Sequence, residues 1–219
     1  MKLSIYLSVA ILNLSLFQSI AQNSTIIDYF SPSEQQSWKS KSFKGYTSYK
    51  FTNEEDNFVL NASCKGTASA FYRKMDIDLT KTPILTWSWK IDATHSGLDD
   101  ISKGGDDYAA RVYVVYKGFM PWDVKALNYV WANRQSKGES WPNAFTSSAF
   151  MIAQESGNAE NKDLWISESR NVLEDFKRYF KADISKIDGI AIMTDCDNGK
   201  GSTSGYYRDI KFLPLNGEL

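Results

Sequence analysis

Histidine and cysteine are scarce in this chain, whose 219 residues include only His95, Cys64 and Cys196 of these two types. Three such side chains are too few for a zinc site of the usual Cys/His type. No Gly-x-Ser-x-Gly motif occurs, and His95 lies in an acidic polar loop where we expect it to be exposed. A Ser/His/Asp catalytic triad therefore has little support. A glycine-rich phosphate-binding loop is also missing, which argues against nucleotide chemistry.

An excess of either charge is missing too. Lys and Arg number 25 against 26 Asp and Glu, so the net charge is -1, and nothing indicates a basic surface for nucleic acid. Hydrophobic residues make up 42% and charged residues 23%, a globular composition that argues against extended disorder. No internal repeat or low-complexity tract is found. Together with the length, these values predict a single domain with a sizeable core.

Residues 1–21 have the pattern of a secretory signal peptide. Lys2 gives a positive start, residues 3–17 form an apolar run, and small residues precede a cleavage point after Ala21. We therefore predict export to the periplasm or secretion, with a mature domain over residues 22–219. The alternative is a membrane anchor, but the run is short for a spanning helix and no cysteine follows it for a lipid. No membrane span is expected after cleavage.

The two cysteines allow two readings. In an exported protein Cys64 and Cys196 could form a disulfide. However, Cys64 falls on the same alternating face as Phe58, Leu60 and Ala62, where a buried free thiol would sit. We expect two reduced core cysteines, with the disulfide as the open alternative.

Aromatic residues are abundant, with 7 Trp, 12 Tyr and 12 Phe. Such side chains can fill a β core or stack on planar and sugar-ring ligands. The clearest pattern is the segment 85–91, in which Leu85, Trp87, Trp89 and Ile91 alternate with polar residues. This alternation predicts a strand that buries both tryptophans on one face.

Alternation of period two predicts that most of the chain forms β-strands. Predicted strands cover residues 46–51, 57–64, 68–75, 85–91, 104–118, 127–132, 149–154, 187–194 and 206–213. Residues 190–194 are apolar on both faces and so belong in a central strand. Residues 171–180 instead have helical spacing, and Asn171 and Glu174 resemble a capping box. The expected fold is mainly β, an antiparallel two-sheet jelly-roll-like sandwich with one short amphipathic helix.

The stretch 104–118, GGDDYAARVYVVYKG, carries a polar face that is unusual for a solvent-exposed strand. Its other face is apolar, while this one alternates through Asp107, Ala109, Arg111 and Tyr113. We interpret it as the floor of a polar cleft. Candidate ligand-binding residues are Asp107, Arg111, Tyr113, Glu168, Arg170 and Asp175.

These acids and arginines can form a buried ion-pair network or a polar ligand clamp. We expect Arg111 to be shielded and bonded to Asp107 or to an acid of residues 168–175. A glycosidase would instead need two carboxylates across a cleft, for example Asp107 with Glu168.

The turn Asp195-Cys196-Asp197-Asn198-Gly199 follows a buried strand. Asp195, Asp197 and Asn198 offer the oxygen ligands that a calcium ion prefers, although the spacing is not that of an EF-hand. Two other uses are open: the side chains can bond the local backbone, or the loop can contact a ligand. Calcium is thus the one cofactor that these residues suggest.

The segments GDDYAARVYVVYKG, NYVWAN, SESRNVLEDFKRYF, IDGIAIMTDCDN and GYYRDIKF occur in this order. Together they resemble a bacterial family of secreted proteins catalogued as domain of unknown function 3047, over roughly residues 30–215. The resemblance implies no established activity. Cys196 stands where that family more often has Thr, which puts a role for this side chain in doubt but not one for Asp195 or Asp197.

We therefore predict an exported β-sandwich that binds a glycan or similar polar ligand in the cell envelope. Aromatic surplus, sandwich architecture and the missing catalytic set favour binding over catalysis. One alternative is a glycan-active enzyme with paired carboxylates. The other is an envelope protein-interaction domain without a small ligand, which would present a flat apolar patch.

Overall fold

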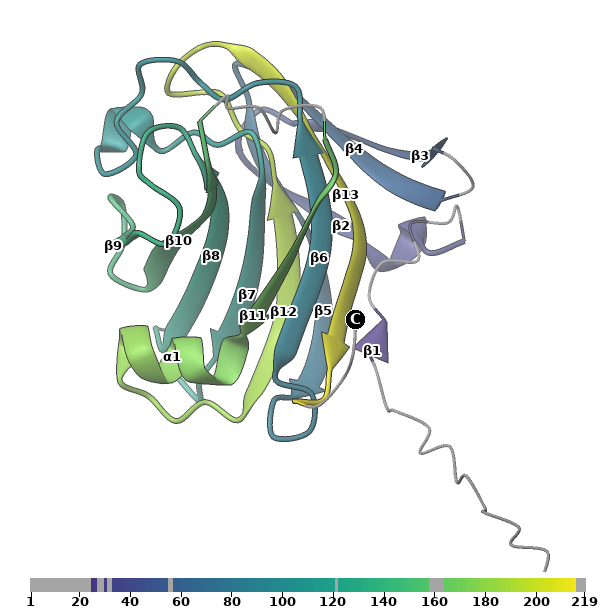
Figure 1. The fold of residues 1–219 in the computed structure, drawn as a ribbon, viewed down its shortest axis with the longest axis vertical. Coiled ribbons are helices and arrows are strands. Elements are labelled where there is room, and N and C mark those ends of the chain that lie inside the picture. The colour runs from purple at the N-terminus through teal and green to yellow at the C-terminus, as the bar shows by residue number, and fades with distance from the viewer. Residues whose placement is uncertain are drawn as a thin grey trace, which may run out of the picture.

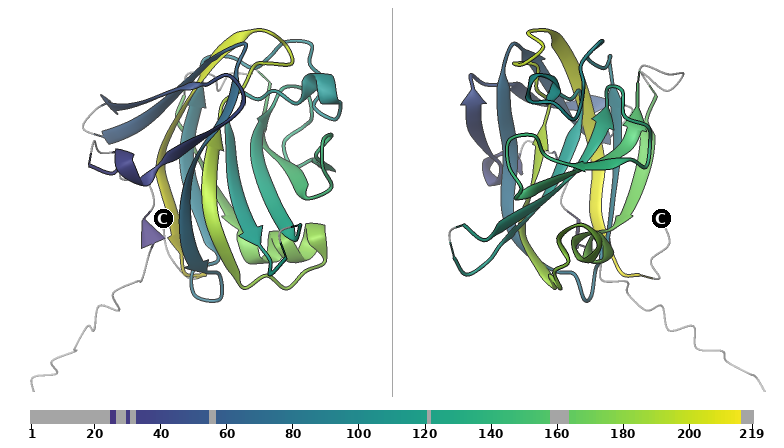
Figure 2. Two further views of the ribbon diagram at one scale, coloured as in Figure 1. Left: turned by 180° about the vertical axis from the view of Figure 1, so that it is seen from behind. Right: turned by 90° about the vertical axis from the view of Figure 1, so that its left-hand side faces the viewer.

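The computed structural model describes residues 25–26, 30, 33–54, 57–120, 122–157 and 164–215. The predicted signal peptide and its cleavage point lie outside these ranges. Within them, none of the helices combines the length and the apolar content that a membrane span requires. Two β-sheets lie one over the other in Figure 1, and Figure 2 shows the same molecule from behind and from one side.

The first sheet has six strands in the order β11-β6-β13-β4-β3, with β1 beside β13. All of these pairings are antiparallel. The strands are β1 (Thr25–Ile26), β3 (Ser48–Glu54), β4 (Asn57–Lys65), β6 (Ile84–Ile91), β11 (Ile166–Asn171) and β13 (Ser202–Leu213).

The second sheet has seven strands in the order β2-β5-β12-β7-β8-β10-β9. Between its described strands, β8 and β10 pair in parallel and the other neighbours are antiparallel. The strands are β2 (Lys39–Lys44), β5 (Ala68–Asp78), β7 (Arg111–Lys117), β8 (Val124–Ala132), β9 (Ser140–Pro142), β10 (Ala149–Ser156) and β12 (Lys186–Met193). The predicted two-sheet sandwich is confirmed, and β12 is an inner strand as expected.

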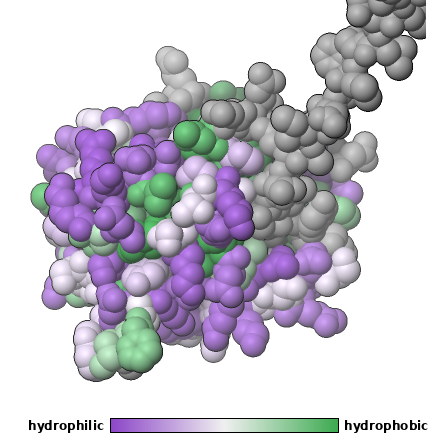
Figure 3. Space-filling model, turned by 90° about the horizontal axis from the view of Figure 1, so that it is seen from below, coloured by the Kyte–Doolittle hydropathy of each residue, from purple (hydrophilic) through white to green (hydrophobic). Residues whose placement is uncertain are grey.

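Helix α1 (Val172–Phe180) lies across one end of the sandwich (Figure 1). Its start follows from the sequence, because the side chain of Asn171 accepts a hydrogen bond from the Glu174 backbone N–H at 3.2 Å. Val172 and Phe176 are buried in the core between the sheets. Seen from this end, the visible surface is mainly hydrophilic, with hydrophobic residues in small separate patches (Figure 3).

The inner faces of both sheets form an aromatic-rich core. Trp87 and Trp89 of β6 are both buried, as the alternation predicts. Trp87 stacks on Tyr129 with ring centroids 5.3 Å apart, and Trp89 lies 5.9 Å from Trp131. Because Tyr129 and Trp131 belong to β8, these pairs join the two sheets across their interface.

The expectation of two free thiols is wrong, because Cys64 and Cys196 form a disulfide with their Cα atoms 6.0 Å apart. Cys64 lies on β4 of the six-stranded sheet, and Cys196 follows β12 of the seven-stranded sheet. The backbone N–H of Cys196 donates to the Thr67 carbonyl at 3.0 Å, which brings the loop after β12 to the turn between β4 and β5. The alternation correctly predicts that Cys64 is buried. The disulfide partner of Cys64 depends on how the two sheets are stacked, which a pattern within one strand does not show.

One predicted strand is shorter than expected. β7 begins at Arg111, while residues 103–105 form a short 3-10 helix, η2 (Lys103–Gly105). A second 3-10 turn, η1 (Gln35–Ser37), precedes β2. The chain between η2 and β7 is nevertheless buried at Asp107, Tyr108 and Ala109, so it lines the interior without ladder pairing.

Candidate functional site

The outer face of the seven-stranded sheet carries the side chains that do not enter the core. Val112 and Val114 of β7 point inward, so Arg111 and Tyr113 point to the outer face. In the ladder, Tyr113 pairs with Asn128 of β8, and Arg111 pairs with Met193 of β12. Side chains from three neighbouring strands therefore meet on this face.

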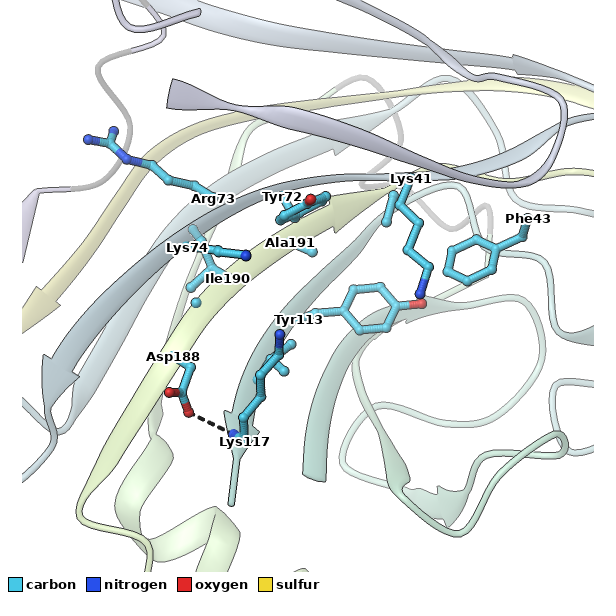
Figure 4. A pocket seen from close by; sticks show the side chains of 13 residues that line it. Lys41, Phe43, Tyr72, Arg73, Lys74, Tyr113, Lys117, Asp188, Ile190 and Ala191 are labelled. Atoms are coloured by element: carbon cyan, nitrogen blue, oxygen red, sulfur yellow. Dashed lines mark hydrogen bonds between the residues drawn. The ribbon is translucent and has the colours of Figure 1, made fainter. Parts of the chain in front are cut away.

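Two adjoining hollows form a groove on this outer face, and both are lined by Phe43 and Tyr113. We call the whole feature the outer groove. One hollow, of about 440 Å³, is named the polar hollow after six of its residues, Asp106, Arg111, Asn128, Asn143, Asp195 and Asp197. The other, of about 390 Å³, is named the lysine hollow; its lining includes Lys41, Tyr72, Lys74, Val115, Lys117 and Asp188 (Figure 4).

Arg111 is held at the bottom of the polar hollow and is only 2% exposed. Its Nε donates to Asp195 Oδ1 at 2.9 Å, and its Nη2 bonds the second oxygen of the same carboxylate. Its Nη1 lies 3.4 Å from Asp106 Oδ1 and 3.2 Å from the Tyr113 hydroxyl. Such a bidentate fork fixes the guanidinium in place.

The ladder explains why Arg111 meets Asp195. Arg111 is opposite Met193 at the end of β12, and Asp195 follows two residues later. The prediction that Arg111 is shielded and bonded to carboxylate is confirmed, but the predicted partners, Asp107 or an acid of residues 168–175, are wrong. Arg111 therefore bonds an acid that the pairing of β7 with β12 brings close, and not an acid that is near in the sequence.

Burial is the largest single influence on the pKa of each member of this ion pair, but it decides the direction of the shift only for Asp195. Burial raises the pKa of Asp195 to about 7, although the Arg111 guanidinium acts to lower it. The neighbouring carboxylates of Asp107 and Asp106 add to the rise. For Arg111, burial acts to lower the pKa, but Asp195 and the surrounding acids more than offset it, so the pKa stays well above its ordinary value. Arg111 is therefore a permanent cation at the bottom of the groove.

Asp107, Asp195 and Asp197 place carboxylate oxygens within 4.8 Å of one another, close enough to consider a metal ion. However, both oxygens of Asp107 already accept N–H donors, from Asn198 Nδ2 at 3.1 Å and from the Gly199 backbone at 2.6 Å.

Both oxygens of Asp195 are likewise bonded to Arg111, and Asp197 lies 3.8 Å from Lys44 Nζ. A calcium ion would have to displace these cations and donors. These contacts fit a loop that is held in place by hydrogen bonds and ion pairs better than they fit a calcium site.

His95 is buried, with 8% of its surface exposed, so the expectation of an exposed histidine is wrong. Its Nε2 lies 2.8 Å from the Asp195 carbonyl oxygen, and its backbone N–H donates to Asn133 Oδ1 at 2.8 Å. Burial lowers the pKa of His95, although the Asp107 carboxylate acts to raise it. The imidazole thus braces the loop at Asp195 from the side.

Asn128 is the feature of the polar hollow that sequence reasoning missed. Its side chain is 1% exposed, yet neither its amide nitrogen nor its amide oxygen has a hydrogen-bond partner among the described residues. A buried amide without partners costs free energy in the absence of a ligand. The signal in the sequence is an Asn within the apolar run of β8, and its meaning depends on which neighbours the sheet supplies.

Two exposed aromatic rings lie on the polar hollow, Phe43 at 61% exposure and Phe145 at 57%. Asn143 also lines it, and its Nδ2 lies 3.2 Å from both carboxylate oxygens of Asp106. The groove therefore offers ring faces beside amide and carboxylate groups.

The remaining predicted ligand-binding residues lie away from the outer groove. Arg170 Nε donates to Asp175 Oδ2 at 2.9 Å, and the Tyr129 hydroxyl donates to the same oxygen at 2.8 Å. This network joins β11 to α1 and β8. None of these residues lines either hollow.

Glu168 belongs to a separate cluster with Lys137 and Glu155. Lys137 Nζ lies 3.8 Å from Glu168 Oε1 and also bonds Glu155. Burial raises the pKa of Glu168 to about 7; Lys137 acts to lower it, and Glu155 acts to raise it. Of the six predicted ligand-binding residues, Arg111 and Tyr113 line the groove, and Asp107 braces the loop beside it.

Comparisons with known proteins give a family match by sequence and distant likenesses to solved structures. The model of the family described as "Protein of unknown function (DUF3047)" matches residues 36–211. No curated protein matches the chain.

Among solved structures, the catalytic domain of Humicola grisea Cel12A with a soaked thio cellotetraose is 11% identical, with 77% of this chain and 87% of that chain covered and a TM-score of 0.44. Endoglucanase Cel12A from Rhodothermus marinus is 8% identical, with coverages of 87% and 98% and a TM-score of 0.44. A structure of carbohydrate-binding modules from the β-sandwich superfamily is 14% identical at a TM-score of 0.39; the match covers 80% of this chain but only 56% of that one. The likeness is one of fold alone.

Proposed function

Because the chain belongs to the DUF3047 family, whose description names no activity, we propose a function from its own residues: it binds a glycan in the outer groove. The observation that carries this proposal is Asn128, a buried amide in the polar hollow without a partner among the described residues. Such a group is costly unless something binds to it. A sugar hydroxyl both donates and accepts hydrogen bonds, so it can satisfy both ends of an amide.

The rest of the outer groove fits the same ligand class. Phe43 and Phe145 expose ring faces on which a sugar ring can stack. Asn143 and Asp197 add polar groups around the hollow. The volume of about 440 Å³ lies within the range, roughly 300–1,000 Å³, of small-molecule sites, and the groove continues into the lysine hollow for a longer chain.

An exported location remains part of this proposal. The disulfide between Cys64 and Cys196 supports it, because disulfides persist in oxidising compartments such as the periplasm or the cell exterior. The proposed mature chain begins at Gln22. Mass spectrometry of the exported protein tests this, and a mass that includes residues 1–21 would contradict it.

The two alternative functions gain less support from the described residues. A glycosidase needs two carboxylates across the bound sugar. Of the expected pair, Glu168 lies with Lys137 outside the groove and both oxygens of Asp107 accept N–H donors. Among the acids of the polar hollow, both oxygens of Asp195 bond Arg111 and both oxygens of Asp106 lie 3.2 Å from Asn143 Nδ2. An interaction domain would present a broad apolar face, whereas the polar hollow has acids, amides and an arginine beside its exposed rings. Glycan binding is therefore the function we propose.

Affinity electrophoresis in gels that contain single polysaccharides tests the proposal. The panel should include neutral polymers, such as xyloglucan and galactan, and acidic ones, such as polygalacturonate and alginate. We expect at least one polymer to retard the protein. Phe43→Ala and Phe145→Ala should each weaken that retention by up to about tenfold, because each removes a stacking ring.

Phe119→Ala is the matched control, because Phe119 is 99% exposed but lines neither hollow. This variant should migrate like the wild type in every gel. Retention by no polymer of the panel, or equal loss in all three variants, would contradict glycan binding in the outer groove.

A further inference from the structure

The lysine hollow collects positive charge on a chain that has no excess of it. The hollow is lined by Lys41 of β2, Lys74 of β5 and Lys117 of β7, while the net charge of the chain is -1. In Figure 4 the side chains of Lys74 and Lys117 extend into the hollow, and that of Lys41 extends toward Tyr113 and Phe43 at one end of it. Because the three lysines come from three strands, it is the folding of the sheet that brings them together, and not a basic segment of the sequence.

Other charges near the hollow are already paired. Arg73 also lines it, but its Nη1 donates to Glu34 at 3.0 Å, and Figure 4 shows its side chain pointing away. Asp188 is the acid of this lining, and its carboxylate accepts the backbone N–H of Lys117 at 2.7 Å.

The three lysines themselves form no ion pair with any acid that the structure describes. Lys41 Nζ lies 5.4 Å from the centre of the Phe43 ring, a contact that holds it at the groove. Lys74 and Lys117 are exposed, like Lys41. The hollow therefore has three ammonium groups and one carboxylate, an arrangement that attracts anions.

The floor beneath these lysines is apolar and open. Tyr72, Tyr113, Val115 and Ala191 contribute to it. Gly189 of β12 also lies there without a side chain, because a Cβ at this position would come within 2.6 Å of the Arg73 carbonyl oxygen. A ring could lie on this floor with its charged substituent among the ammonium groups.

We propose that the glycan bound by the outer groove is acidic, a polysaccharide that carries carboxylate or sulfate groups on its sugar rings. This inference rests on the proposed glycan binding and adds the chemical class of the ligand. The anionic groups bind over the lysine hollow through Lys41, Lys74 and Lys117.

The charge of the polar hollow determines which part of the bound polysaccharide lies over it. Asp106, Asp195 and Asp197 line it, and Arg111 is the one cationic side chain among the described residues of its lining, so the acids outnumber the cation and disfavour an anionic group. Sugar hydroxyls suit it better, because they can donate to these carboxylates and pair with the Asn128 amide. The acidic substituent of the ligand therefore lies over β5, β12 and β7, and its hydroxyl-rich part lies over β8.

Matched pairs of polymers that differ only in charge test this inference. Affinity electrophoresis would compare polygalacturonate with its methyl ester, and dextran sulfate with dextran. We expect retention by at least one acidic member and none by its neutral counterpart. Lys74→Gln and Lys117→Gln should each weaken retention by about fivefold, the size expected for one exposed charge contact.

Lys50→Gln is the control, because Lys50 is an exposed lysine on β3 of the other sheet. It removes the same charge, and retention should not change. Equal weakening in Lys50→Gln and Lys74→Gln would overturn the proposal, since it would show attraction to net charge alone. Binding to phosphatidylserine vesicles without retention by any acidic polymer would also overturn it.

The outcomes separate this inference from the proposed function. Retention by neutral polymers alone, or equal retention by both members of a pair, would overturn the acidic ligand but leave glycan binding in place. Retention by no polymer, neutral or acidic, would overturn both.

Discussion

Arg111 stabilises the polar hollow by directed bonds that a point charge does not reproduce. Its guanidinium reaches both oxygens of Asp195 and also approaches Asp106 and the Tyr113 hydroxyl. An ammonium group is a compact charge on a flexible stem and cannot form the same fork. The geometry around Asp195 therefore depends on arginine at this position.

We expect Arg111→Lys to lower the free energy of unfolding by at least about 1.5 kcal/mol, the lower value for one charge-assisted hydrogen bond. Urea denaturation measures this loss. Lys50→Arg, at an exposed position of β3, should change stability by less than about 0.5 kcal/mol. An Arg111→Lys variant as stable as the wild type would mean that the fork contributes nothing to folding.

Glu168 gives the molecule a pH dependence that its position explains. Burial raises its pKa from an ordinary value of 4.5 to about 7 in the folded state. The folded protein thus favours the protonated carboxyl, and the stability from this preference is complete below about pH 4.5. It is lost as pH rises through about 7, because ionisation is then easier in the unfolded chain.

Glu168→Gln removes this titration and keeps a neutral side chain of similar shape. We expect the wild type to lose stability relative to the variant as pH rises from about 4.5 to about 7. Thermal midpoints of both proteins across this window measure the difference. A difference that stays constant with pH, or changes in the opposite direction, would show that the Glu168 pKa is not raised by folding.

At the scale of elements, local patterns predict strands that bury one face and miss several of the strands at the sheet edges. β6 and α1 were predicted almost to the residue, because the spacing of the tryptophans and the Asn171 cap are local signals. β2 was missed because all of its residues are exposed, and β9 was missed because it has three residues. Edge strands need not alternate, since neither of their faces has to be apolar.

Local patterns likewise predict only part of the candidate site. Alternation along β7 placed Arg111 and Tyr113 on a polar face, which is a property of one strand. Lys41, Lys74 and Asn128 were not found, because each reads as an ordinary residue of its own strand. Only the order β2-β5-β12-β7-β8 brings them to one groove.

Strand β6 supplies the sharpest stability test of the fold. Trp89→Ala should lower the free energy of unfolding by about 3–5 kcal/mol, because it leaves a cavity between the sheets beside Trp131. Trp122→Ala is a matched control, since Trp122 is 74% exposed, and should cost less than about 0.5 kcal/mol. Urea denaturation compares them, and equal midpoints for the two variants would place Trp89 outside the core.

For the whole molecule, the disulfide is a covalent cross-link between β4 of one sheet and the loop after β12 of the other. It joins residues 132 positions apart and so restricts the unfolded chain strongly. We expect the double variant Cys64→Ala with Cys196→Ala to lose about 2–5 kcal/mol of unfolding free energy.

Reduction of the wild type should reproduce this loss in denaturation experiments, and the double variant should not respond to reductant. Thiol titration of the unreduced, denatured wild type should find no free thiol. Two free thiols in protein purified from the exported fraction would contradict the bond.

The central claim is that the outer groove of the sandwich is a binding site, and Asn128 tests it most directly. Asn128→Leu keeps the size of the side chain but replaces an amide that has no partner among the described residues. Because the folded protein gains no bond from that amide, we expect Asn128→Leu to be at least as stable as the wild type. We also expect it to lose retention on the polysaccharide that retards the wild type. A variant that is less stable but retained as strongly as the wild type would contradict the account.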